Sequence, residues 1–255
     1  MSTIRTHTQS TTGYRPRAAI FAYSIVAYAL GMTALVWLVA SAAGLCPFGT
    51  GPLETTTTAG ALAVNATLVV LFGVQHSVMA RQRFKDWWTR SVPPAAERST
   101  YVLTAGLALG LLLWLWQPMP STIWSVSGPL ARGFIWALFA SGWLYLVAAT
   151  FATNHFDLFG LRQAWLHLRE RPYTPVPFVR HWMYRYSRHP MMAGILVGLW
   201  ATPEMRADHL VLATGFTAYV AIGVAFEERE LAGHFGNEYR RYCREVGALL
   251  PRLRA

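Results

Sequence analysis

The chain has 255 residues and a net charge of +10; 54% of its residues are hydrophobic and only 13% are charged. A soluble domain carries about 25% charged residues, so the composition argues against an ordinary soluble protein and for several membrane spans. A soluble bundle of buried helices is the alternative. The positive charge does not indicate a nucleic-acid partner, because no soluble domain remains to carry a basic face.

Uncharged apolar runs follow one another along the chain. Four of them have the ~20 residues that a helix needs to cross ~30 Å of hydrocarbon. These four are 18–43, 59–80, 100–119 and 133–153. A fifth run, 190–202, is short unless residues 184–189 extend it backwards, and a sixth covers 209–226. The polar residues 203–208 between these two indicate the turn of a helical hairpin. We predict an all-α, polytopic membrane bundle of five to six transmembrane helices.

Basic residues gather on alternate sides of these runs. Of the 22 lysines and arginines, all but Arg132 and Arg206 precede the first run or follow the second, fourth or sixth. The positive-inside rule then places both termini in the cytoplasm. We expect residues 1–17 to be a disordered cytoplasmic N-terminus and residues 18–255 to form one membrane domain.

Three of the eight histidines lie at predicted cytoplasmic ends of spans: His76, His155 and His189. No two histidines in the chain lie within five residues of each other, whereas a membrane metal centre built from histidines needs them clustered. We therefore predict no metal site. A haem held by two facing histidines stays open, although no motif supports it.

Several short motifs in the last third of the chain occur together in one order. They are Arg188-His189-Pro190, residues 227–231 with the sequence EEREL, residues 235–239 with the sequence FGNEY, and Leu249-Leu250-Pro251. This order resembles the C-terminal core of the isoprenylcysteine carboxyl methyltransferase superfamily. The resemblance implies an integral membrane methyltransferase that binds S-adenosylmethionine without a soluble nucleotide-binding domain. It also implies a cytoplasmic cofactor pocket in the C-terminal half, within residues 154–251.

Motifs further upstream narrow the resemblance. Gln75-His76-Ser77 resembles the NnrU-like branch of the superfamily. Residues 154–163 and 171–174 resemble the bacterial methanethiol S-methyltransferases. This resemblance implies an enzyme of the bacterial inner membrane, surrounded by lipid, with its active site facing the cytoplasm. It would transfer a methyl group from S-adenosylmethionine to a small volatile thiol, methanethiol, and release dimethyl sulfide and S-adenosylhomocysteine.

Two residues depart from the superfamily pattern. Met192 stands where the pattern has a tyrosine, which would reshape the wall of the cofactor or acceptor site. Glu245 stands where the carboxyl methyltransferases have a basic residue, unless the alignment slips by one position to Arg244. An arginine there would bind a substrate carboxylate, whereas a glutamate would repel it. The second departure therefore favours a neutral or thiol acceptor.

The resemblance also implies roles for the residues of the C-terminal motifs. Arg188 and His189 can donate to the cofactor's carboxylate, and Glu227 or Glu228 can accept from its ribose hydroxyls or ammonium. Tyrosines can form walls for the adenine and the sulfonium, although tyrosines near a membrane boundary also belong to the interfacial belt. Tyr184, four residues before Arg188, would share its helix face. The expected cofactor-binding residues are Tyr184, Tyr186, Arg188, His189, Pro190, Glu227, Glu228 and Tyr239.

Methyl transfer to a thiol needs a thiolate or a group that removes the thiol proton. His76 and His155 are the candidate catalytic residues, because histidine is readily tuned for proton transfer. Asn154 is the third candidate, as a hydrogen-bond donor that positions the thiol. The alternative is that both histidines only cap helices or hold a loop. The expected substrate contacts are Gln75, Gln163 and Met192.

Two other functions stay open. One is a carboxyl methyltransferase acting on a prenylcysteine-like or other lipophilic acceptor. The other is a non-enzymatic NnrU-like membrane protein. The sequence does not predict the oligomeric state.

Overall fold

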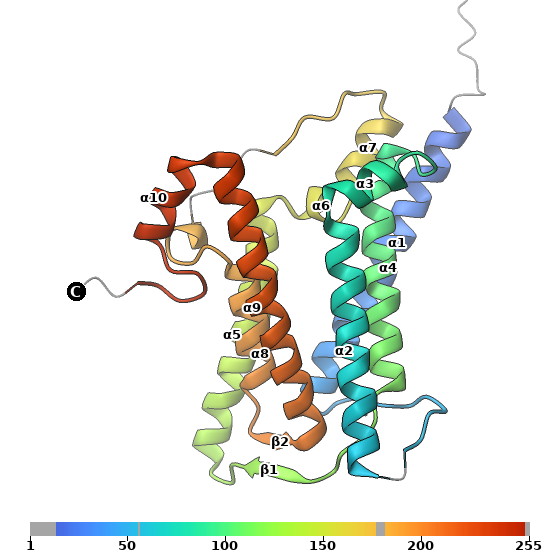
Figure 1. Cartoon of the computed structure of the whole chain (residues 1–255). Coiled ribbons are helices and arrows are strands. Elements are labelled where there is room, and N and C mark those ends of the chain that lie inside the picture. The colour runs from blue at the N-terminus through green and yellow to red at the C-terminus, as the bar shows by residue number, and fades with distance from the viewer. Residues whose placement is uncertain (1–13, 56, 177–181, 253–255) are drawn as a thin grey trace, which may run out of the picture.

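The computed structural model describes residues 14–55, 57–176 and 182–252. Within them, long helices form a bundle, and a two-stranded sheet closes one end of it (Figure 1). Five of the described helices are long and apolar enough to cross a membrane, which confirms the predicted polytopic fold. They are α1 (Tyr14–Ala42), α2 (Thr58–Ala80), α4 (Pro94–Leu115), α5 (Pro129–Thr153) and α9 (Ala207–Phe235).

Shorter elements gather at the two ends of the bundle (Figure 1). At one end lie α3 (Gln82–Trp88), α6 (His155–Leu158), α7 (Leu161–Leu168) and α10 (Asn237–Glu245). The opposite end carries the sheet of β1 (Thr122–Ser125) and β2 (Glu204–Arg206). The first end is the one that the arginine distribution assigns to the cytoplasm, so we call it the basic end.

The start of the membrane domain differs from the prediction. Helix α1 begins at Tyr14, so residues 14–17, which were expected to be disordered, are helical. Residues 1–13 lie outside the described part of the chain. Apolar residues continue the helix pattern only from residue 18, and Pro16 in the first turn of a helix costs no hydrogen bond. The hydrophobic pattern therefore does not mark the start of α1 at Tyr14.

The short apolar helix α8 (Pro190–Trp200) does not extend backwards to residue 184 as considered above. Residues 182–185 form a separate 3-10 turn, η1, and Pro190 occupies the first turn of α8. A proline disfavours helical geometry in the residue before it, which explains the break at His189. With 11 residues, α8 is about 16 Å long, roughly half of the ~30 Å hydrocarbon layer.

The polar segment 203–208 is not a simple turn between α8 and α9. Its residues 204–206 form β2, which pairs antiparallel with β1, so that Ser125 faces Glu204 and Thr122 faces Arg206. The indole nitrogen of Trp124 donates to the Thr202 carbonyl at 3.0 Å. The sequence did not predict this sheet, because a four-residue strand with mostly exposed side chains carries no alternating pattern.

Glycines allow α8 to lie close against α5. A Cβ atom added at Gly194 would lie 2.7 Å from the Gly142 carbonyl oxygen, and one added at Gly198 would lie 2.5 Å from the Trp143 ring. Small residues let helices approach closely in a membrane, where van der Waals contact drives association. Because Arg188 and His189 directly precede Pro190, the first residue of α8, the packing of α8 against α5 also constrains where these two residues lie.

Candidate active site

Four charged side chains from two segments meet at the basic end. We call Arg188, His189, Glu227 and Glu228 the C-terminal charge cluster. The Arg188 guanidinium donates to Glu228 Oε1 from Nε at 2.8 Å and from Nη2 at 2.6 Å. His189 Nε2 lies 3.1 Å from the same oxygen, and His189 Nδ1 lies 3.5 Å from Glu227 Oε2. The structure thus brings together four of the predicted cofactor-binding residues, and Glu227, with 53% of its side chain exposed, is the most open of them.

The end of the chain holds this cluster in place. The Arg188 and His189 amides donate to the Gly247 and Ala248 carbonyls, each at 2.9 Å. Arg188 Nη1 also donates to the carbonyls of Cys243 and Val246. Because the guanidinium is already bound by Glu228 and these two carbonyls, Arg188 holds α9 to the C-terminal segment. These bonds use four of its five N–H groups and leave one N–H on Nη2 for the expected contact with a cofactor carboxylate.

The predicted tyrosines occupy different environments. Tyr239 on α10 is buried, and its ring centre lies 6.0 Å from that of Tyr242. Burial raises the pKa of the Tyr239 phenol, and the negative charge of the nearby Glu228 raises it further. Tyr184 is buried in η1 and Tyr186 is exposed. The expectation that Tyr184 and Arg188 share a helix face is wrong, because the chain leaves helical geometry between them. Pro190 and Met192 lie in the first turn of α8.

Opposing influences set the pKa of His189. Burial alone would lower the pKa, but the hydrogen bonds and charges of Glu227 and Glu228 outweigh burial and raise it. The raised pKa favours the imidazolium, which neutralises part of the negative charge of the two glutamates.

We expect His189 to stabilise the fold most at low pH. The pKa of an unfolded histidine is about 6.5 and the folded value is higher, so the contribution is complete below about pH 6.5 and is lost as the pH rises through the folded pKa. The unfolding temperature of the wild type should therefore fall more between about pH 6 and pH 9 than that of His189→Gln. Tryptophan fluorescence in detergent measures both, and equal slopes would contradict this role.

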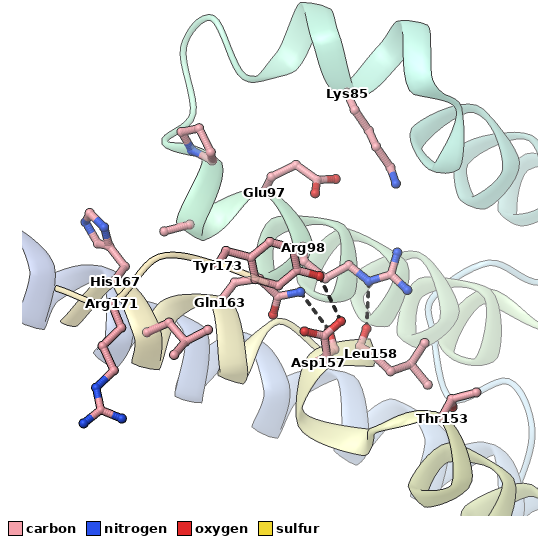
Figure 2. A pocket seen from close by; sticks show the side chains of 13 residues that line it. Lys85, Glu97, Arg98, Thr153, Asp157, Leu158, Gln163, His167, Arg171 and Tyr173 are labelled. Atoms are coloured by element: carbon pink, nitrogen blue, oxygen red, sulfur yellow. Dashed lines mark hydrogen bonds between the residues drawn. The ribbon is translucent and has the colours of Figure 1, made fainter. Parts of the chain in front are cut away.

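A second site at the basic end is a polar pocket of about 530 Å³. We call it the polar pocket. Its lining comes from α3, α4, the last residue of α5, α6, α7 and the segment after α7. Figure 2 shows its side chains, which include Lys85, Glu97, Arg98, Asp157, Gln163 and Tyr173. The volume suits a small-molecule ligand. The lining comes from residues 85–173, whereas the predicted pocket lay within 154–251, and of the predicted site residues this pocket includes only Gln163.

Hydrogen bonds fix the wall of the polar pocket around Asp157. Its Oδ1 accepts from Arg162 Nη1 at 2.8 Å and its Oδ2 from the Tyr173 hydroxyl at 3.3 Å (Figure 2 shows the tyrosine bond). Gln163 Nε2 donates to the Asp157 carbonyl at 3.0 Å. Gln163 Oε1 is buried and has no hydrogen-bond partner in the described part of the chain. Arg98 Nε donates to the Leu158 carbonyl at 2.8 Å and so joins α4 to this wall.

Local sequence explains how α5 turns into this wall. Asn154 adopts a left-handed conformation with φ 94°, and its side chain accepts the Asp157 amide at 3.2 Å, which caps α6. Gly160 has φ 87°, and a Cβ there would lie 2.5 Å from the Ser99 hydroxyl. The chain can therefore pass close to α4 only with glycine at this position.

His155 holds the same junction. Its Nδ1 lies 2.8 Å from the Thr150 hydroxyl and its Nε2 lies 2.8 Å from the Tyr28 hydroxyl. The ring stacks on Phe151, and burial lowers its pKa. Both ring nitrogens are engaged, and the Asn154 side chain caps a helix. These contacts correspond to the structural alternative for both residues.

His76 has a different environment near the basic end of α2. Its Nε2 lies 2.7 Å from the Tyr101 hydroxyl, while its Nδ1 is buried and has no hydrogen bond within the described residues. The amide nitrogen of the neighbouring Gln75 lies 3.2 Å from the Thr104 hydroxyl. The Arg98 guanidinium lies 5.2 Å from the centre of the Tyr101 ring. A chain of contacts therefore leads from His76 through Tyr101 to Arg98 in the wall of the polar pocket.

Tyr184 is influenced by residues of both sites. Burial raises the pKa of the Tyr184 phenol, the neighbouring Thr153 lowers it, and the charge of Glu227 raises it. Thr153 lines the polar pocket. Sequence reasoning missed Arg98, Asp157 and Tyr173, although Asp157 and Tyr173 belong to motifs that it had singled out.

The fold and the site define a polytopic helical membrane protein whose polar chemistry gathers at one end of the bundle. In the described residues, no group of three His, Cys, Asp or Glu side chains could hold a metal ion. The sequence profile of the NnrU protein family matches residues 64–249, and the chain belongs to this family.

Curated relatives agree with this assignment. The chain is 54% identical to a methanethiol S-methyltransferase of Mycobacterium tuberculosis, over 75% of the chain and 78% of that enzyme. It is 45% identical to methanethiol S-methyltransferase 1 of Bradyrhizobium diazoefficiens, over 91% of the chain and 81% of the relative. Human nurim is 30% identical over 67% of the chain and 68% of nurim. No solved structure is significantly similar to the chain.

Proposed function

We propose that the chain is an S-adenosylmethionine-dependent methyltransferase that converts methanethiol into dimethyl sulfide. The observation that carries this proposal is the 54% identity to a methanethiol S-methyltransferase along three quarters of the chain. Residues 64–249, which the family profile matches, contain both the charge cluster and the polar pocket. The arginine distribution supports an active site on the cytoplasmic side, where the methyl donor is supplied.

The reaction is an in-line displacement. A lone pair of the thiol sulfur forms a bond to the methyl carbon, while the bond from that carbon to the sulfonium sulfur breaks and its electrons return to sulfur. The thiol proton goes to a base, and both organic products are thioethers. Much of the rate enhancement can come from holding the two sulfur atoms in line. Methanethiol is small and apolar, so it can reach the site through the bilayer.

We assign the predicted residues to this reaction as follows. Glu227 accepts from the ribose hydroxyls, and tyrosines 184, 186 and 239 border the nucleoside. Arg188, His189, Glu228 and Pro190 hold this arrangement in place. His76 accepts the thiol proton beside Gln75, and Asn154 and His155 hold the junction of α5 and α6. Gln163 and Met192 remain as predicted substrate contacts.

Purified protein in detergent, supplied with S-adenosylmethionine and methanethiol, should release dimethyl sulfide, measured by headspace gas chromatography. Glu228→Ala should lose most of this activity, because it leaves the buried Arg188 without its carboxylate. Glu230→Ala is the matched control. Glu230 lies two positions after Glu228 on α9, and its contact with Arg81 is long, at 3.7 Å.

Three results would contradict the proposal in different ways. Cofactor binding without dimethyl sulfide would indicate another acceptor, and methyl-ester formation on prenylcysteine would identify a carboxyl methyltransferase. Neither cofactor binding nor product would favour a non-enzymatic protein.

A further inference from the structure

The polar pocket holds charges of both signs that the protein does not pair. Lys85 of α3 and Glu97 of α4 both line it, and neither forms an ion pair within the described residues. Figure 2 shows the Lys85 ammonium, the Glu97 carboxylate, the Arg98 guanidinium and the Asp157 carboxylate around one space. Lys85 and Glu97 share this pocket without pairing and are available to a ligand. Asp157, in contrast, is already paired with Arg162.

A buried acceptor adds to this pattern. Gln163 Oε1 has no hydrogen-bond partner in the described part of the chain, although its amide nitrogen is fixed on the Asp157 carbonyl. An unpaired buried acceptor is costly, and a ligand that brings an N–H group would satisfy it. The pocket thus offers acceptors on Glu97, Asp157 and Gln163 beside donors on Lys85 and Arg98.

This mixture favours a ligand that carries both charges. A simple anion would face two carboxylates, and a simple cation would face the ammonium of Lys85 and the guanidinium groups of Arg98 and Arg171. A zwitterionic α-amino acid group places an ammonium and a carboxylate a few bonds apart, and so complements both sets at once.

We propose that the polar pocket binds the zwitterionic amino-acid end of the methyl donor. Glu97, Asp157 and Gln163 receive the ammonium, and Lys85 and Arg98 receive the carboxylate. The proposal rests on the proposed function and refines it, because four of the five N–H groups of Arg188 are already bound to Glu228 and to two carbonyls, whereas Lys85 in the polar pocket has no ion pair within the described residues. The charge cluster then takes the nucleoside end.

Two ligands that differ only in the amino-acid end test this assignment. S-adenosylhomocysteine carries it, whereas 5′-methylthioadenosine has the same nucleoside and sulfur without it. Calorimetry on the full-length protein in detergent should show that Lys85→Met and Glu97→Gln each weaken S-adenosylhomocysteine binding about 10-fold. Neither change should alter the affinity for 5′-methylthioadenosine. The matched controls are Arg83→Met and Asp86→Asn, two exposed charges of α3 outside the pocket, which should leave both affinities unchanged.

The possible outcomes separate this inference from the proposed function. Wild-type affinity for S-adenosylhomocysteine in both pocket variants would overturn the inference and leave the methyltransferase in place. Equal weakening of both ligands would also overturn it, because the variants would then act on the nucleoside site or on folding, which thermal unfolding would reveal. If the wild type binds neither ligand, the proposed function fails together with the inference.

Discussion

Replacing Arg188 with alanine should lower the free energy of unfolding by about 3–5 kcal/mol. The side chain is only 8% exposed and its guanidinium binds Glu228 and two carbonyls of the C-terminal segment. Removing it takes this donor from both carbonyls and leaves the Glu228 carboxylate with His189 Nε2, 3.1 Å away. It also separates α9 from the residues after α10. Denaturant unfolding in detergent, followed by the fluorescence of the tryptophans, measures this loss.

A second arginine that pairs with α9 supplies the control. Arg81 lies 3.7 Å from Glu230, and both side chains are largely exposed. An exposed ion pair contributes at most about 1 kcal/mol, so Arg81→Ala should change stability little. If Arg188→Ala costs no more than Arg81→Ala, the C-terminal charge cluster does not hold the fold together. In the double variant Arg188→Ala/Glu228→Ala, part of the loss should return, because the partly buried carboxylate is gone as well.

The membrane helices were predictable because their signal is local. The length and the polarity of a run such as 133–153 can be recognised without knowledge of its neighbours. The RHP and EE motifs were likewise recognisable as parts of one site, and the structure brings Arg188 within 2.6 Å of Glu228 across 40 positions.

The polar pocket could not be predicted in the same way. Arg98 joins its wall through the Leu158 carbonyl, 60 positions away, and Glu97 faces that wall from the first turn of α4. Nothing in either local sequence indicates the other. The role of Arg188 was also not predictable, because the local sequence is the same whether the arginine binds a cofactor or holds the C-terminal segment. Only the carbonyls of Cys243 and Val246 distinguish the two roles.

Replacing His76 with asparagine should lower kcat for dimethyl sulfide formation about 10²–10⁴-fold and leave S-adenosylhomocysteine binding nearly unchanged. When His76 Nε2–H donates to the Tyr101 hydroxyl, 2.7 Å away, its buried Nδ1 carries a free lone pair that can accept the thiol proton. An asparagine keeps a polar group there but cannot accept that proton. Rates at saturating concentrations of both substrates, with binding by calorimetry, separate the two effects.

His155 provides the contrast that makes this prediction decisive. Both of its ring nitrogens already have hydroxyl partners, on Thr150 and Tyr28, so His155→Asn should lower the unfolding temperature while the folded protein keeps its kcat. Tyr101→Phe should reduce kcat by a smaller factor than His76→Asn. The His76 imidazole loses the hydrogen bond that orients it but keeps its basic nitrogen. Full activity in His76→Asn would mean that no base is needed and that the site works by holding the thiol in line with the sulfonium. Loss of kcat in His155→Asn without loss of stability would instead assign the role of base to His155, at the junction of α5 and α6.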